Sequence, residues 1–159
     1  MKITLPLKQN KFPFILKDGF FDSKDSNFST KLSVYLDLIN IYGFRASQLA
    51  MDIKVVDSLT QNTCLADLVV YDQFLKPQII IKVKTIDDYK EYDDQNFTTN
   101  LFDLANFSVK TVKYLVLVYP NITGYIDQKD FVVIDFNKYK TFKDWHNSGF
   151  KHFDFIPII

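Results

Sequence analysis

The chain has 159 residues, of which 47% are hydrophobic and 24% charged. This is enough for one globular domain with its own core, and too hydrophobic for a disordered chain. Nineteen basic and nineteen acidic residues give a net charge of zero, which argues against a strongly basic nucleic-acid coat and a polyacidic tail. The single cysteine excludes an internal disulfide framework and a cysteine-rich zinc site.

No apolar run approaches the roughly 20 residues that cross a bilayer. The first residues also lack the apolar core and cleavage site of a signal peptide. We therefore expect a cytoplasmic protein with no membrane partner. Arginine and glutamate occur once each, as Arg45 and Glu91. The chain thus has little capacity for bidentate recognition of guanine or phosphate, although its lysines can still contact phosphate.

The first predicted helix follows a segment, 1–28, that is rich in phenylalanine and interrupted by proline. We expect this segment to form an extended arm or a short hairpin on the body of the domain. Ser29 or Asn27 can cap the helix, and Gly43 ends it. Its apolar stripe recurs at helical spacing and consists of Leu32, Tyr35, Leu36, Ile39 and Tyr42.

Three strands are predicted next, at 49–56, 64–71 and 78–85. The short connections between them favour antiparallel pairing. The run Ile79-Ile80-Ile81 in the third strand is apolar on both faces, which is typical of a central strand in a covered sheet.

A second helix is predicted over 91–107, from an apolar stripe formed by Phe97, Leu101, Leu104, Ala105 and Phe107. It can carry the chain across to a strand at 112–119 that runs parallel to the third strand. A last strand at 131–136 and a short helix from a Thr141 cap to Trp145 follow. The order predicts an α/β fold, with a mixed sheet between helices in a single domain.

Polar residues are placed where the second and third strands face each other. Asp67 begins an apolar strand run, while Lys82 and Lys84 lie two residues apart near the end of the next strand. Because side chains alternate along a strand, both lysines share one face, and Asp67 can lie opposite them on the paired strand.

These residues resemble the PD-(D/E)xK nuclease superfamily, and more closely the N-terminal endonuclease-like domain of type I restriction enzyme R subunits. The resemblance covers roughly 30–121. It implies a nuclease-like core over 29–121, followed by a C-terminal strand and helix in 122–159. Asp52 matches the first acid of the family pattern, Asp67 the second, and Lys84 the motif lysine. Gln95 matches the helix glutamine, and Asn100 lies where the pattern has an asparagine.

The resemblance implies a restriction-endonuclease-like fold that acts on DNA. In the family, the acids, here Asp52 and Asp67, bind one or two Mg²⁺ ions that polarise the phosphate. The lysine, here Lys84, helps to orient and activate the attacking water. A homodimer and restriction–modification subunits are the partners that such a protein would have.

The sequence departs from the family at three positions. Lys82 stands where the family has the glutamate of Glu-x-Lys, Ala66 replaces a basic residue before the motif aspartate, and Thr99 replaces a tyrosine. Lys82 would remove a metal ligand and could pair with Asp67 or Asp52 in place of the metal. We therefore expect a DNA-binding domain with impaired or absent cleavage.

Two alternatives remain open. An active Mg²⁺-dependent endonuclease would need a relocated acid, such as Asp87, Asp88 or Glu91. A non-catalytic protein-interaction module would agree with the zero net charge and the single arginine.

The residues also have purely structural interpretations. Asp67 can be a turn residue at a strand edge, Lys82 and Lys84 a strand end that reaches solvent, and Gln95 and Asn100 a polar helix face. The acidic run 87–94 is expected to be solvated. His146 and His152 are expected at the surface or in packing contacts, and Cys64 in a buried strand.

Overall fold

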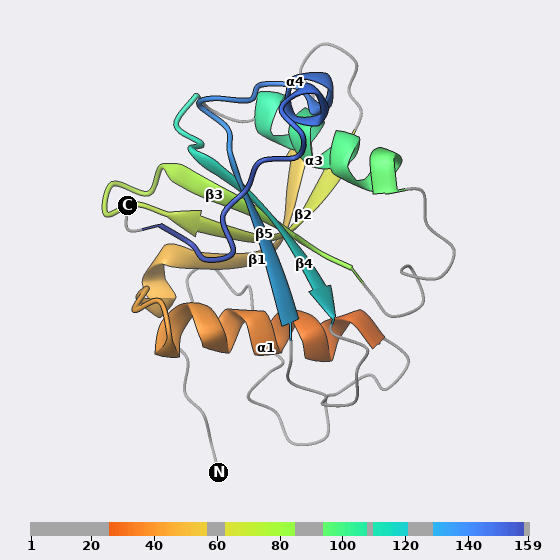
Figure 1. The fold of residues 1–159 in the computed structure, drawn as a ribbon. Coiled ribbons are helices and arrows are strands. Elements are labelled where there is room, and N and C mark those ends of the chain that lie inside the picture. Colours follow the sequence, from red (N-terminus) through yellow and green to blue (C-terminus); the bar gives the residue numbers. More distant parts are fainter. Residues whose placement is uncertain (1–25, 57–62, 85–93, 108–109, 121–128, 158–159) are drawn as a thin grey trace.

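The computed structural model describes residues 26–56, 63–84, 94–107, 110–120 and 129–157. These residues form a five-stranded mixed sheet with helices on both faces, as the sequence predicts (Figure 1). The strands are β1 Leu49–Val56, β2 Thr63–Tyr71, β3 Pro77–Val83, β4 Tyr114–Pro120 and β5 Lys129–Asp135. The helices are α1 Ser26–Asn40, the 3₁₀ turn η1 Ala46–Gln48, α3 Asp94–Phe107 and α4 Phe142–Asn147.

The strands lie in the sheet in chain order, β1-β2-β3-β4-β5. The first three pair antiparallel, β4 runs parallel to β3, and β5 is antiparallel to β4. A parallel connection needs a crossover, and α3 lies between β3 and β4 in the chain and over one face of the sheet (Figure 1). Both the antiparallel triplet and the parallel fourth strand are therefore confirmed.

The sheet separates two apolar cores. Helix α1 covers one face, where Val34 and Leu38 pack with Ile79 and Ile81. Helices α3 and α4 cover the other face, which holds Ile80. The three consecutive isoleucines of β3 therefore divide between the cores and are at most 1% exposed, which confirms β3 as the central strand.

Helix α1 buries a stripe that differs from the predicted one. Its buried positions are Lys31, Val34, Tyr35 and Leu38. Of the predicted positions, only Tyr35 is buried; Leu36, Ile39 and Tyr42 pack at the margin of the core. Both sets have helical spacing, and an amphipathic pattern does not fix the rotation of a helix whose apolar face is wide. The consequence is that a lysine, Lys31, lies inside the buried stripe.

The remaining elements agree with the sequence within one to three residues at most ends. Thr141 caps α4, since its Oγ1 accepts a hydrogen bond of 3.1 Å from the Asp144 amide. In α3 the predicted Leu101, Leu104 and Ala105 are buried, and Phe102 is buried with them. Most of the predicted N-terminal arm lies outside the described residues. Among the described helices, none is long and apolar enough to cross a membrane.

Candidate functional site

Two aspartates face each other across β1 and β2. Met51 pairs with Leu68 and Ile53 pairs with Ala66, so the register places Asp52 directly opposite Asp67. Met51 and Leu68 pack in the core under α1, whereas Ile53 and Ala66 pack on the α3 side. The alternation of side chains is therefore broken at the same place in both strands. Asp52 is the residue that turns the backbone of β1, with φ of 53°, a conformation that aspartate tolerates better than most residues.

The Asp67 carboxylate also ends the pairing of β2 with β3. The ladder stops at the pair Leu68–Ile81, and Oδ2 of Asp67 accepts the next backbone hydrogen bond, from the Val83 amide at 2.7 Å. A buried N–H group requires a partner, and here a charged side chain replaces the carbonyl of a paired strand. Asp67 is only 4% exposed, so it is a buried strand residue and not a turn residue at an edge.

A third charged group, the ammonium of Lys31 on α1, joins the two aspartates. Its Nζ lies 2.8 Å from Oδ1 of Asp52 and 3.2 Å from Oδ1 of Asp67. The side chains of Lys31 and Asp67 are 8% and 5% exposed, while that of Asp52 is 46% exposed. We call these three residues the Asp–Lys–Asp cluster. The sequence indicated the two acids, but it did not indicate that their partner would come from helix α1.

The protonation of Lys31 follows from its surroundings. Burial alone lowers the pKa of the ammonium, but the hydrogen bond to Asp52 and the charges of Asp67 and Asp52 outweigh burial, and the pKa of Lys31 is raised. Lys31 is therefore a cation that holds its proton, and the cluster has the character of a buried ion pair with a second, half-exposed carboxylate.

A divalent metal does not fit the cluster as it stands. A cation bound by Asp52 and Asp67 would share their oxygens with an ammonium that already lies within 3.2 Å of both, and Mg²⁺ prefers several oxygen ligands. Among the residues that the structure describes, no group of three or more His, Cys, Asp or Glu side chains is arranged to hold a metal ion. The lysine between the acids is Lys31, whereas the sequence suggested that Lys82 could take this role.

Lys82 and Lys84 differ in burial. Lys84 is 1% exposed; its amide donates to the Val118 carbonyl at 2.9 Å, and its Nζ lies 5.3 Å from the centre of the Tyr119 ring. Lys84 directly follows Val83, whose amide donates a hydrogen bond to the Asp67 carboxylate. The structure therefore brings Asp67 to the backbone beside Lys84. Lys82 is partly buried.

The side chains of most other predicted site residues lie outside the described part of the chain. Gln95 lies near the start of α3, but its side chain is outside the described part, as are Asp87, Asp88, Glu91 and the Cys64 side chain. Asn100 is exposed on α3, which is what a polar helix face predicts. The histidines are exposed as expected: His146 packs edge-on against Phe150, and His152 bonds the Phe150 carbonyl.

Lys31 is the residue that sequence reasoning missed, and its signal was present. It lies three residues before Val34, four before Tyr35 and seven before Leu38, all of them buried. A lysine in register with an apolar stripe requires a carboxylate partner when buried. Placing the stripe on Leu32 and Leu36 moved Lys31 away from the core and hid this requirement.

No protein-family model matches this chain, and a search of curated proteins found no match.

Proposed function

We propose that this chain is a nuclease-like domain that binds DNA and does not cleave it. The observation that carries the proposal is the position of Lys31, whose ammonium lies between the carboxylates of Asp52 and Asp67. These are the two residues that the resemblance assigns to the metal. An internal cation therefore occupies the space that catalysis would need.

The chemistry of an ammonium supports a loss of cleavage. A bound Mg²⁺ polarises the phosphate, lowers the pKa of a water nucleophile and orients both reactants. An ammonium is a hydrogen-bond donor without an open coordination position, and it cannot hold a hydroxide against phosphorus. Lys31 balances the charge of the two acids and keeps the strands together, but it supplies none of these functions.

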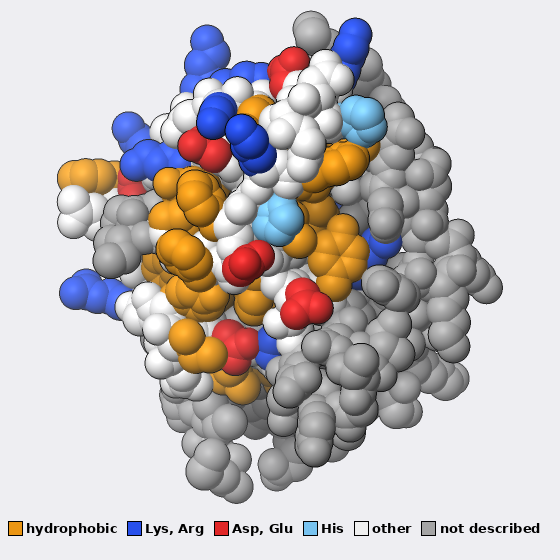
Figure 2. Space-filling view, in the orientation of Figure 1, with side chains coloured by type: hydrophobic (Ala, Val, Ile, Leu, Met, Phe, Trp, Pro, Cys, Tyr) orange, Lys and Arg blue, Asp and Glu red, His pale blue; other side chains and the backbone are white. Residues whose placement is uncertain are grey.

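A cationic surface supports the binding part of the proposal. The segment 138–152 contains four lysines and a single aspartate, and all four lysines are exposed. Figure 2 shows Lys and Arg side chains over the end of the molecule where α4 lies, beside a stretch of hydrophobic side chains. Lysine point charges can neutralise phosphates without reading a base sequence, so one arginine in the chain is no obstacle to such binding.

The test combines metal binding with cleavage. Calorimetric titration with Mn²⁺ is expected to give no binding to the wild type, and plasmid DNA is expected to stay intact in Mg²⁺ or Mn²⁺. Lys31→Glu would place a third carboxylate beside Asp52 and Asp67, and we expect it to bind Mn²⁺. Lys31→Ala is the second variant, which opens the site without adding a charge and keeps the test valid if Lys31→Glu does not fold.

Cleavage by the wild type that disappears in Asp67→Ala would refute the non-cleaving part of the proposal. It would favour the active endonuclease with a relocated acid from 87–91.

A DNA-binding measurement at several salt concentrations tests the binding part. We expect salt-sensitive binding, because released counterions make phosphate binding weaken steeply with salt. DNA binding that is undetectable even at low salt would refute the binding part.

A protein-interaction module is the second candidate, and one observation favours it. The turn between β2 and β3 exposes two apolar side chains, Phe74 at 72% and Leu75 at 52%. Hydrogen bonds hold this turn: Asp72 accepts from the amides of Phe74 and Lys76 at 2.8 and 2.9 Å. Failure of DNA binding would make this turn the place to mutate first.

A further inference from the structure

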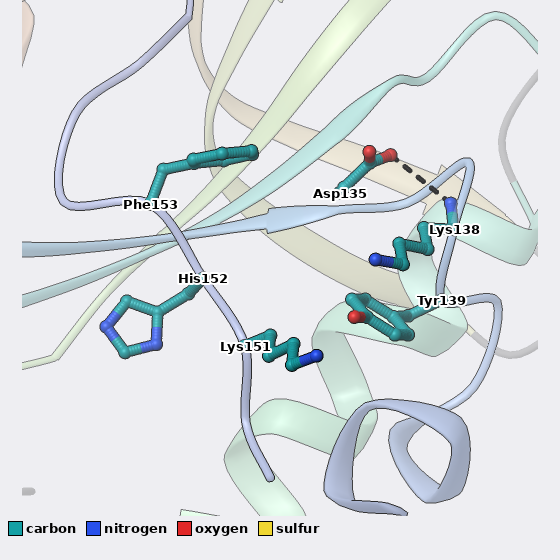
Figure 3. Close-up of a pocket in the computed structure, with 6 residues that line it drawn as sticks. All are labelled: Asp135, Lys138, Tyr139, Lys151, His152 and Phe153. Carbon is teal, nitrogen blue, oxygen red and sulfur yellow. Dashed lines mark hydrogen bonds between the residues drawn. The ribbon is translucent and has the colours of Figure 1, made fainter. Parts of the chain in front are cut away.

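A pocket of about 340 Å³ opens beside the end of β5, on the cationic segment 138–152. Its volume falls within the usual range for small-ligand sites, about 300–1,000 Å³. The lining combines two ammoniums, a histidine, two aromatic rings and one carboxylate. The residues are Asp135, Lys138, Tyr139, Lys151, His152 and Phe153 (Figure 3).

The backbone under this pocket is fixed from both sides. Phe153 and Val133 exchange two hydrogen bonds of 2.9 Å, so the C-terminal segment lies against β5. The Lys151 carbonyl accepts a bond of 2.8 Å from the indole of Trp145. Oδ1 of Asp135 accepts from the amides of Asn137 and Lys138. The lining side chains therefore project from a preorganised frame, which lowers the cost of ordering them around a ligand.

The charged groups favour an anion. In Figure 3 the ammonium ends of Lys138 and Lys151 both point toward the Tyr139 ring, and Nζ of Lys138 lies 5.5 Å from its centre. Asp135 is the opposing charge, but its Oδ1 already accepts two backbone amides. Two lysines and one carboxylate give the lining of the pocket a net positive charge, and the carboxylate is already partly satisfied by the two amides. Two ammonium groups that point toward the same ring suit the oxygens of one phosphate.

The aromatic groups favour a flat ligand next to that anion. Phe153 is 41% exposed, although its backbone is held, so part of a phenyl ring is available at the pocket. Tyr139 is only 8% exposed and forms part of the wall. Nucleobases stack on exposed aromatic rings whatever their identity. Lysines beside an exposed aromatic ring can hold the phosphate and the base of one nucleotide.

We propose that this pocket binds one nucleotide unit of a single-stranded nucleic acid, with its phosphate on Lys138 and Lys151 and its base on Phe153. This inference rests on the proposed DNA binding. It adds where on the domain the nucleic acid binds and which side chains contact it. A single strand is required because a base in a duplex is stacked and does not offer its face to a protein ring. Oδ2 of Asp135 can accept a hydrogen bond from an N–H group of the base, such as N3–H of thymine.

The experiment is fluorescence anisotropy of the whole chain with a labelled thymidylate oligomer, with free thymidine monophosphate and duplex DNA in separate arms. The variants are Lys151→Ala and Phe153→Leu. Lys54→Ala is the matched control for charge, since Lys54 is exposed on β1, outside the cationic segment 138–152, and does not line the pocket. Phe74→Leu is the matched control for loss of an exposed ring.

We expect Phe153→Leu to weaken oligomer binding at least about fivefold, the lower end of base–aromatic stacking. Lys151→Ala should lower the slope of log affinity against log salt by about 0.7, as expected for one lost contact to a single strand. Both controls should have smaller effects. Far-ultraviolet circular dichroism of each variant verifies that the fold is kept.

The other possible outcomes distinguish a failure of the pocket proposal from a failure of the proposed DNA binding. Oligomer binding that neither pocket variant changes more than its control would overturn the pocket and leave the proposed function. Pocket-dependent binding of the free nucleotide without binding of the oligomer or the duplex would support the pocket as a nucleotide site and overturn DNA binding. Absence of binding in every arm would overturn both.

Discussion

Asp52 and Asp67 lie directly across from each other on neighbouring strands, and one ammonium, that of Lys31, contacts both carboxylates. Like charges at opposite positions destabilise a strand pair. Lys31 belongs to α1, so the pairing of β1 with β2 at this point depends on the docking of a helix that precedes both strands. The charge balance of the cluster therefore connects helix packing with sheet formation.

The two aspartates should differ strongly in their contribution to stability. Asp67→Asn weakens a buried ion pair and the charge-assisted bond to the Val83 amide, and we expect it to lower the free energy of unfolding by about 3 kcal/mol. Asp52 is half exposed, so Asp52→Asn should cost about 1 kcal/mol or less. Urea denaturation measures both values. Equal costs would contradict the burial difference on which this prediction rests.

Alkaline pH should remove the contribution of Lys31. Its pKa is raised in the folded chain above the ordinary value of 10.5, so the folded state holds this proton more tightly than the unfolded state. The stability that wild type has over Lys31→Met should be complete below pH 10.5 and decline as the pH rises through the higher folded pKa. Denaturation at a series of alkaline pH values gives this difference, with Lys143→Met as the control for loss of a surface charge.

A lysine whose side chain is only 6% exposed, Lys129, connects β5 to α1. Nζ of Lys129 lies 2.8 Å from Oδ2 of Asp37 and 2.5 Å from Oγ of Ser33. Lys129→Met leaves Asp37 without this cation, and we expect a loss of about 3 kcal/mol, the lower end for a broken buried pair. Replacing both charges, with Lys129→Met and Asp37→Leu together, should cost less than Lys129→Met alone. A double variant that is less stable than the single one would show that the pair is not the origin of the loss.

The turn that precedes the pocket requires a left-handed backbone at Gly149, where φ is 78°. A Cβ at this position would meet nothing within 4 Å, so the cost of a side chain comes from the backbone conformation alone. Gly149→Ala should lower stability by about 1 kcal/mol. Gly149→Asn should lose less, because asparagine tolerates this conformation better than alanine. Thermal unfolding of the pair is the measurement, and a larger loss for asparagine would be the contrary result.

The strand order and directions of the sheet could be predicted because they follow from sequence features within single strands and their connections. The three isoleucines of β3 indicate a strand buried on both faces, and the short connections before β3 permit only antiparallel neighbours. The helix between β3 and β4 then makes the fourth strand parallel. These inferences use residues within one or two elements, and the structure confirms them.

The candidate site could be predicted only in part, because it depends on helix rotation and on one unusual backbone angle. The sequence indicated Asp52 and Asp67, but strict alternation would not bring both into contact with α1. The positive φ of Asp52 changes the alternation in β1, and the rotation of α1 directs Lys31 toward the sheet. Neither follows from residue type. The pocket at Lys138 and Lys151 was missed because the net charge of the whole chain conceals a lysine-rich segment.

The bridge between Val133 and Phe153 has a consequence for self-association. β5 is the last strand in the sheet order, and an exposed outer strand is a template on which another chain can form hydrogen bonds. Phe153 already occupies the amide and carbonyl of Val133 in the middle of that strand. An incoming strand would have to displace the C-terminal segment before it could add to the sheet. The same few residues that frame the pocket therefore act as a guard against edge-to-edge aggregation.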